Sequence, residues 1–413
     1  MEKVKLALPT EAQIAWQNLE LGMFFHFGMN TFCDQEWGEG TDSPELFNPK
    51  EFDARQWVKL AKDAGFKYVI LTAKHHDGFC LWPTKTTDYS VKSSPWKDGK
   101  GDVVREVADA CKEEDMHFGI YVSPWDRHEP CYQDKEAYDD FYCEQLNELM
   151  TQYGPMMEVW FDGAGSEGRV YDWDRMIGII KKHQPNAMIF NMGQPTIRWV
   201  GNEEGLAPYP CWNTESAAKI SMFSDDKVDW LPGTPDWLPA ECDVPIRKLH
   251  WFWHPNDEDS LRTLDELMHI YYNSVGHGTN LLLNVSPDDR GLIPDIDAKR
   301  LLEFSSELKS RFSNSLGSTF GQGQKLELTL ENETSIDHII LMEDISFGER
   351  VRKFELEALV DEEWVSIGEG SAIGHKYIKQ TNGIKTRRLK LTITESVETP
   401  MIKEFTCYRS EKK

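Results

Sequence analysis

The sequence predicts an α/β protein: a (β/α)8 TIM-like barrel, irregular around units five to six, followed by a C-terminal antiparallel β-sandwich. Three observations predict this fold. Short apolar runs alternate with amphipathic helical stretches over residues 1–315, polar side chains follow most of these runs, and beyond residue 315 apolar and polar residues alternate one by one. Strands that alternate with helices form a parallel sheet covered by helices, whereas a period of two indicates an antiparallel sheet.

The first part of the chain contains seven recognisable strand–helix units. The expected strands cover residues 23–27, 68–72, 118–122, 158–161, 188–191, 251–253 and 281–285. The expected helices cover residues 53–64, 103–114, 135–152, 173–182, 260–275 and 296–312. The first helix has apolar residues at helical spacing and is stopped by Gly65. This many units favours a closed barrel over an open sheet, and the Pro, Gly and Trp residues of 202–248 predict a missing helix there.

The last part of the chain has the pattern of a β-sandwich. Its segments KLELTLEN, HIILMED, RKFELEALV, EWVSIGEG and RRLKLTITE alternate in polarity and are separated by turn residues. The predicted domains are therefore a barrel over residues 1–315 and a sandwich over residues 316–413. We expect the sandwich to support the barrel, since residues 318–413 contain no cluster of aromatic residues that would form a sugar-binding platform.

The composition excludes several classes of function. Lys and Arg number 45 against 70 Asp and Glu, a formal net charge of −25, which excludes a nucleic-acid partner because such a partner needs clustered cations. No apolar run approaches the roughly 20 residues that span a bilayer, so no membrane span is expected. Aromatic residues make up 12% of the chain, and this share favours sugar binding.

Two features bear on the cellular compartment. The N-terminus has no apolar signal core, which predicts a cytoplasmic protein, or a periplasmic or secreted one if a signal has been removed. The eight cysteines are scattered and form no CxxC motif, which indicates reduced thiols rather than a zinc or thioredoxin-type site. Nothing in the pattern predicts an oligomeric state.

Polar side chains stand where the predicted strands end. Because a barrel builds its site from the C-terminal ends of its strands, these side chains are expected to converge on one mouth. They are His26, His75, His76, Asp162, Asn191 and Asn284.

The HHDGF motif leaves three roles open for His75 and His76. One histidine can belong to the core and the other to a loop, the pair can bind zinc, or the pair can bind substrate hydroxyls. Zinc is disfavoured because His26 is followed by Phe-Gly rather than a second histidine and no HExxH motif occurs. Neutral imidazoles that donate to and accept from vicinal hydroxyls fit better, so no metal or cofactor is expected.

The acidic motifs are open between catalytic and structural roles. In EVWFDGAG, Asp162 ends an apolar strand before small residues that let a substrate approach, but this position also suits a helix-capping Asp. In RWVGNEEG, Glu203 and Glu204 lie in a Gly-flanked loop and by composition alone suit a solvated turn. Glu36 and Trp37 of EWGEG either bind a hydroxyl and a sugar face or are ordinary loop residues.

Taken together, HFG, EWG, HHDGF, the WFDG strand, RWVGNE and NLLLNVSP resemble the α-L-fucosidases of glycoside hydrolase family 29, in a consistent order from about residue 10 to 410. The resemblance implies a retaining exo-hydrolase on a barrel with a C-terminal sandwich. The RWVGNE loop resembles the subfamily that prefers α-1,3/1,4-linked fucose on branched glycans. The implied partner is a fucosylated oligosaccharide or glycoconjugate.

The resemblance also implies roles for individual residues. Asp162 matches the nucleophile and Glu203 the general acid/base, with Glu204 and then Glu215 as alternatives because this loop varies in length. A non-catalytic protein that binds fucosylated glycans is the alternative function, and the presence of both Asp162 and a candidate acid argues against it. The residues that match the family's substrate-binding positions are His26, Glu36, Trp37, His75, His76, Tyr121, Trp160 and Arg198.

Overall fold

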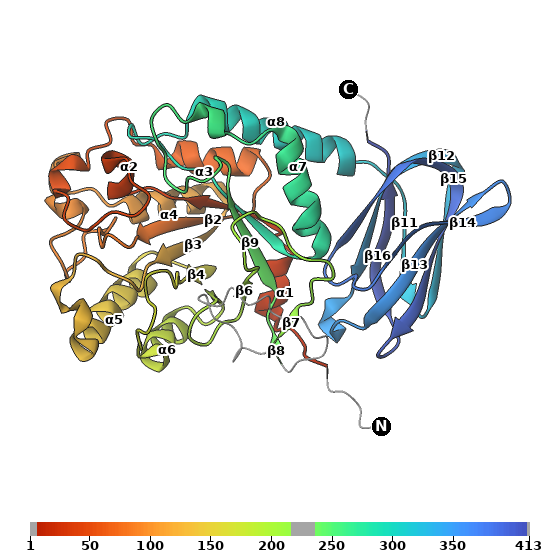
Figure 1. Ribbon diagram of the computed structural model, residues 1–413, viewed down its shortest axis with the longest axis horizontal. Helices are drawn as coiled ribbons and strands as arrows, with labels where there is room; N and C mark the ends of the chain where they lie inside the picture. Colours follow the sequence, from red (N-terminus) through yellow and green to blue (C-terminus); the bar gives the residue numbers. More distant parts are fainter. Residues whose placement is uncertain (1–5, 216–235, 411–413) are drawn as a thin grey trace.

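The computed structural model describes residues 6–215 and 236–410 (Figure 1). Its first sheet is parallel and has the strand order β5-β4-β3-β2-β1-β10-β9-β6. These strands are β1 Leu21–Phe25, β2 Tyr68–Lys74, β3 His117–Val122, β4 Glu158–Trp160, β5 Met188–Phe190, β6 Arg198–Trp199, β9 Ala240–Pro245 and β10 Asn280–Asn284.

The two ends of this sheet meet between β5 and β6. A parallel bridge joins Phe190 to Ile197, the residue before β6, and the backbone N–H of Asn191 donates to the carbonyl of Ile197 at 3.1 Å. The sheet therefore closes on itself, and the predicted barrel is confirmed.

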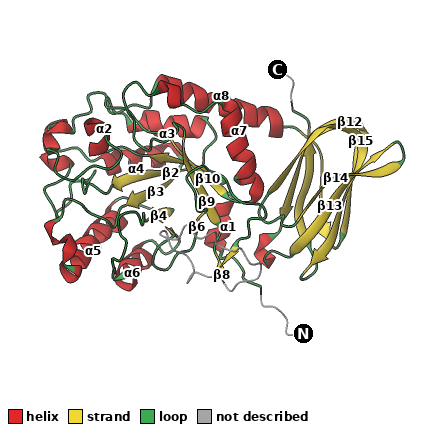
Figure 2. Ribbon diagram, viewed as in Figure 1, coloured by secondary structure: helices red, strands yellow, loops and turns green. Residues whose placement is uncertain are grey.

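Helices cover the outside of the barrel (Figure 2). In α3 the buried residues Ala54, Trp57, Val58 and Ala61 lie at helical spacing, and the side chain of Asp53 caps the first turn. Among the described residues, no helix is long and apolar enough to cross a membrane. The helices are α1 Glu11–Gln17, α2 Met29–Cys33, α3 Ala54–Asp63, α4 Val103–Glu114, α5 Lys135–Gln152, α6 Trp173–His183, α7 Leu264–Asn273 and α8 Asp295–Phe312.

The prediction of a strand at residues 251–253 was wrong. That segment is a loop, and the next barrel strand after β6 is β9, inside the stretch expected to be irregular. Strand β9 does not form a continuous apolar run, because Glu241 and Asp243 alternate along it with apolar residues of the outer core. As expected for residues 202–248, no helix occurs in the described part of that stretch, residues 202–215 and 236–248.

The C-terminal strands form an antiparallel sheet in the order β11-β16-β12-β15-β13-β14. The long strands β12 and β15 pair with each other, while β16 joins the second half of β12 and β13 joins the second half of β15. The two long strands thus contribute to both layers of a sandwich. The strands are β11 Ser315–Gln322, β12 Lys325–Glu343, β13 Val351–Val360, β14 Glu363–Gly370, β15 Tyr377–Ser396 and β16 Met401–Tyr408.

Two buried glutamates form the polar floor of the barrel. Trp16 donates its indole N–H to Glu158 at 2.9 Å, and Glu241 accepts from the Tyr68 hydroxyl at 2.6 Å and from the Trp160 indole at 3.0 Å. Burial raises the pKa of Glu241 to about 7 and raises that of Glu158 as well, so the pair holds a proton at neutral pH. This network fixes the orientation of Trp160 beneath the mouth of the barrel.

Candidate active site

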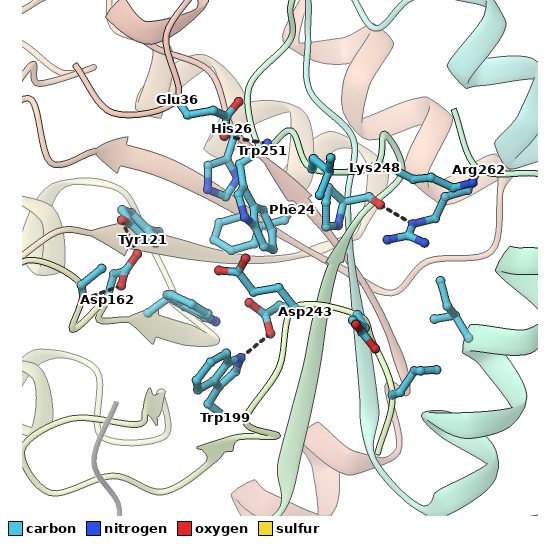
Figure 3. Close-up of a pocket in the computed structure, with 18 of the residues that line it drawn as sticks. Phe24, His26, Glu36, Tyr121, Asp162, Trp199, Asp243, Lys248, Trp251 and Arg262 are labelled. Atoms are coloured by element: carbon cyan, nitrogen blue, oxygen red, sulfur yellow. Dashed lines mark hydrogen bonds between the residues drawn. The ribbon is translucent and has the colours of Figure 1, made fainter. Parts of the chain in front are cut away.

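A cavity of about 1340 Å³ opens at the C-terminal ends of the barrel strands (Figure 3). Figure 3 shows Asp162 and Tyr121 on one side of it and Lys248 and Arg262 on the other. Of the residues singled out in the sequence, those that line it are His26, Glu36, Trp37, His75, Tyr121, Trp160, Asp162, Glu203 and Glu204.

Asp162 follows β4 and is held by two hydrogen-bond donors, with the ring of His76 nearby. Its Oδ1 accepts from the backbone N–H of Ala164 at 2.9 Å, and its Oδ2 accepts from the Tyr121 hydroxyl at 2.9 Å. Nε2 of His76 lies 3.5 Å from the same Oδ2. Burial on its own would raise the pKa of Asp162, but these contacts outweigh it and lower the pKa below its ordinary value. Asp162 is therefore ionised at neutral pH.

His76 contacts Asp162 from behind and is not part of the cavity wall. Its Nδ1 lies 2.7 Å from the Ser123 hydroxyl, and that hydroxyl donates to the carbonyl of Trp125 at 2.8 Å. The hydroxyl therefore accepts from His76, which fixes the ring and leaves Nε2 facing Asp162.

His26 and His75 are neutral. Nδ1 of His26 donates to Oδ1 of Asn284 at 2.8 Å, since the amide nitrogen of Asn284 is committed to the carbonyl of Trp251. Burial lowers the pKa of His26 to about 3 and lowers that of His75 well below its ordinary value. Nδ1 of His75 has no hydrogen-bond partner in the described part of the chain. Both rings can therefore exchange hydrogen bonds with substrate hydroxyls.

Glu203 lies in the loop after β6. Loss of hydration within the cavity raises its pKa, a hydrogen bond from the Trp251 side chain lowers it in part, and the negative charges of Asp162 and Glu36 raise it further. Glu204 also lines the cavity, whereas Glu215 is buried in the short strand β7 Thr214–Glu215 and does not.

Glu36 and Trp37 occupy the rim. The carboxylate of Glu36 accepts from the backbone N–H groups of Trp251 at 2.9 Å and Phe252 at 3.1 Å, and it lies 2.7 Å from Nε2 of His254. The Trp37 side chain is half-exposed and meets the ring of His76 edge-on at 5.3 Å between centroids. Glu36 thus ties the 251–254 loop to the rim while Trp37 offers an open aromatic face.

Of the last two candidates from the sequence, Trp160 lines the cavity and Arg198 does not. Trp160 lines the cavity and stacks on Phe190 with centroids 3.9 Å apart. Arg198 is buried away from the cavity, and its Nη2 donates to the carbonyl of Trp212 at 2.7 Å. Because side chains alternate along a strand, the next residue, Trp199, faces the cavity instead.

Sequence reasoning missed Asp243, Trp199 and Trp251, and it missed the far half of the cavity. The acidic residues at positions 241 and 243, two apart in an otherwise apolar segment, were a signal for a strand with a polar inner face. The far half is lined by Leu206, Lys248, Leu249, Arg262, Asp265, Glu266, His269 and Ile270.

The site can carry acid–base chemistry on two carboxyl groups. The same cavity is lined by Asp162, whose pKa is lowered, and by Glu203, whose pKa is raised. Carboxyl groups whose pKa values are pushed apart take the nucleophile and proton-donor roles. In the described residues, no group of three or more His, Cys, Asp or Glu side chains is placed to hold a metal ion.

Known proteins are similar to this chain in sequence and in fold. The family model described as Alpha-L-fucosidase matches residues 39–311. Alpha-L-fucosidase 1 of Arabidopsis thaliana is 41% identical over 98% of this chain and 88% of its own length. The crystal structure of SpGH29 superposes over 100% of both chains with a TM-score of 0.94 and 35% identity. A Ruminococcus gnavus GH29 fucosidase in complex with fucose has a TM-score of 0.90 and 32% identity, over 98% of this chain and 95% of its own.

Proposed function

Because the chain belongs to the α-L-fucosidases of glycoside hydrolase family 29, we propose that it removes terminal α-1,3/1,4-linked L-fucose from branched glycans by a retaining, double-displacement mechanism. The observation that carries the mechanism is the opposite pKa shift of Asp162 and Glu203 in one cavity.

In the first step the ionised Asp162 attacks the anomeric carbon of fucose. Glu203 gives its proton to the glycosidic oxygen, so that the leaving group departs as a neutral alcohol and a glycosyl ester forms on Asp162. In the second step Glu203 takes a proton from water, which attacks the same carbon and releases fucose with its original configuration. The Tyr121 hydroxyl and the amide of Ala164 hold Asp162 in place throughout.

Fucose recognition would rest on the histidines and the aromatic walls. L-Fucose carries two neighbouring cis hydroxyls and a methyl group where galactose has a hydroxymethyl group. The free Nε2 of His26 accepts a hydrogen bond from one hydroxyl, and His75 contacts the other. An apolar wall against the methyl group would reject galactose by leaving its extra hydroxyl unpaired.

The far half of the cavity supports a branched leaving group. Lys248, Arg262 and Asp265 provide donors and acceptors for sugar hydroxyls, and Leu249, 89% exposed, provides an apolar contact for a sugar ring. A cavity built for one monosaccharide would need none of these residues. The size and polarity of this half support the proposed preference for branched, α-1,3/1,4-fucosylated substrates.

The test is release of fucose from α-1,2-, α-1,3-, α-1,4- and α-1,6-fucosylated oligosaccharides, followed by chromatography. We expect release from the branched α-1,3 and α-1,4 substrates. Asp162→Ala and Glu203→Ala should each lose at least about 100-fold in kcat, and azide should restore part of it. Glu204→Ala and Glu215→Ala are the matched controls.

Two outcomes would contradict the proposal. Tight binding of the glycans without release of fucose would favour a binding protein. Near-normal turnover of Glu203→Ala together with loss in Glu204→Ala or Glu215→Ala would move the acid/base role to that residue.

A further inference from the structure

Asp243 is a buried carboxyl group in the cavity wall to which the proposed mechanism gives no role. It lies on β9, where Glu241, Asp243 and Pro245 follow one another at the spacing of a single strand face. Glu241 belongs to the barrel floor, and Asp243 and Pro245 line the cavity. Asp243 is only 3% exposed.

One oxygen of Asp243 is held by the protein and the other is not. Oδ1 accepts from the indole N–H of Trp199 at 2.7 Å (Figure 3), and the backbone N–H of Trp199 in turn donates to Asn191 at 3.1 Å. Apart from a contact with its own backbone amide, the Asp243 carboxyl group makes no other hydrogen bond to a described residue. A carboxyl oxygen that lines a cavity and has no such partner can pair with a ligand or water there.

The surroundings of Asp243 favour its protonated form. Burial raises its pKa well above the ordinary value, and the nearby charges of Glu203 and Glu241 raise it further, while the Trp199 hydrogen bond lowers it in part. The other charged groups of the same cavity are Glu36, Asp162, Glu167, Glu204, Lys248, Arg262, Asp265 and Glu266. Because Oδ1 accepts from Trp199, the proton resides on Oδ2.

The position of Asp243 indicates which part of the substrate it meets. Figure 3 shows it between Asp162 and Tyr121 on one side and Lys248 and Arg262 on the other. Glu203, which must reach the glycosidic oxygen, is close enough for its charge to act on Asp243. Asp243 and Glu203 therefore lie close together in the wall of one cavity.

We propose that Asp243 binds the leaving-group sugar as a neutral carboxyl group, with Oδ1 anchored by Trp199 and Oδ2–H donating to a sugar oxygen beside the scissile bond. The inference rests on the proposed fucosidase activity and adds a specificity residue to it. A neutral donor at this position favours an uncharged hydroxyl or ring oxygen of the leaving group. Asp243 would thereby favour a sugar leaving group over a leaving group that has no hydroxyl or ring oxygen beside the scissile bond.

The test compares Asp243→Asn with Asp243→Ala on two substrates, a branched α-1,3/1,4-fucosylated trisaccharide and an aryl α-L-fucoside. An asparagine keeps the acceptor for Trp199 and replaces the O–H donor with an N–H donor. We expect Asp243→Asn to stay within about threefold of wild-type kcat/KM on the trisaccharide and Asp243→Ala to lose about tenfold. On the aryl fucoside, Asp243→Ala should lose less than about threefold.

Several results would overturn this inference. They are an Asp243→Asn variant as impaired as Asp243→Ala, an Asp243→Ala variant with wild-type kcat/KM on the trisaccharide, or equal losses on both substrates. Asp88→Asn, on a surface side chain that is 94% exposed, is the control, and circular dichroism checks folding. Failure of the wild-type protein to release fucose from either substrate would instead refute the fucosidase proposal itself.

Discussion

At the scale of single residues, the site depends on keeping two carboxyl groups in different protonation states. Hydrogen bonds from Tyr121 and Ala164 and the nearby ring of His76 stabilise the charge of Asp162. Loss of hydration and the neighbouring negative charges disfavour the charge of Glu203. Activity should therefore rise with pH as Asp162 ionises and fall again as Glu203 loses its proton.

Replacing Tyr121 by Phe tests the first half of this argument. The variant keeps the ring that stacks on His75 but removes the O–H donor to Asp162, so the pKa of Asp162 should rise. We expect the acid limb of the kcat/KM profile to move to higher pH and kcat/KM at its optimum to fall roughly tenfold or more. The measurement is the pH dependence of aryl fucoside hydrolysis.

Tyr142→Phe provides the matched comparison, because the Tyr142 hydroxyl donates to the carbonyl of Val122 at 2.7 Å and does not reach the cavity. Its acid limb should stay where the wild-type limb lies. An unchanged acid limb in Tyr121→Phe would show that this hydroxyl does not tune Asp162.

At the scale of elements, the loop after β9 is joined to the loop after α2 by one histidine. His254 places Nδ1 2.6 Å from Asp34 and Nε2 2.7 Å from Glu36, so both ring nitrogens meet carboxylates. Burial on its own would lower the pKa of His254, but the hydrogen bonds and charges of Asp34 and Glu36 outweigh it and raise the pKa. The loop that carries Trp251 is thereby held against the rim by a charged contact.

Replacing His254 by Gln should loosen this contact and raise KM for fucosides roughly three- to tenfold, with a smaller change in kcat. The reason is that Trp251 packs on His26 with centroids 5.1 Å apart and meets Glu203, so its position shapes the cavity. In the wild-type protein the same contact should weaken as pH rises through the raised pKa of His254. Steady-state kinetics of the variant at several pH values measures both effects.

His117→Gln, at the exposed start of β3, controls for loss of a histidine elsewhere. If KM of His254→Gln matches that control at every pH, the 251–254 loop is held by its backbone hydrogen bonds to Glu36 alone.

At the scale of the whole molecule, the sandwich holds a barrel segment in place. Glu349 of the sandwich accepts from the backbone N–H of Asn213 at 3.0 Å and from its side-chain amide at 2.8 Å. The Tyr209 hydroxyl donates to the carbonyl of Ala372 at 2.9 Å. The chain between β6 and β7, which includes Glu203, is therefore anchored to the sandwich as well as to the end of α7, where the carbonyl of Asn273 accepts from the backbone N–H of Ala207 at 2.8 Å.

Replacing Glu349 by Ala should lower the free energy of unfolding by about 1–3 kcal/mol, because it leaves two buried N–H groups of Asn213 unpaired. Burial and the charge of Glu343 raise the pKa of Glu349 from 4.5 to about 7. Ionising this group therefore opposes folding, and wild-type stability should fall as pH rises between these two values. The variant should lose that part of the pH dependence.

Denaturant unfolding at several pH values measures both quantities, with Glu363→Ala on the exposed edge strand β14 as the control. Equal stability of the two variants would show that the contact with Asn213 does not support the barrel.

The sequence was sufficient for the parts of the protein that a local pattern encodes. Apolar runs followed by polar residues located most barrel strands and placed His26, His75 and Asp162 at their ends, because a strand buried on both faces must be apolar along its length. The change to a period of two located the sandwich for the same kind of reason. In both cases the pattern of buried and exposed positions can be recognised in consecutive residues.

Only the tertiary structure decided what depends on register and on distant neighbours. Strand β9 was missed because its inner face carries Glu241 and Asp243, which are stabilised by partners far away in the chain. Strand β6 has only two residues, which is too short for a sequence pattern to show which side chain faces inward. In the structure Arg198 lies outside the cavity and Trp199 lines it. Hydration and charge, which separate Asp162 from Glu203, likewise exist only once the loops are brought together.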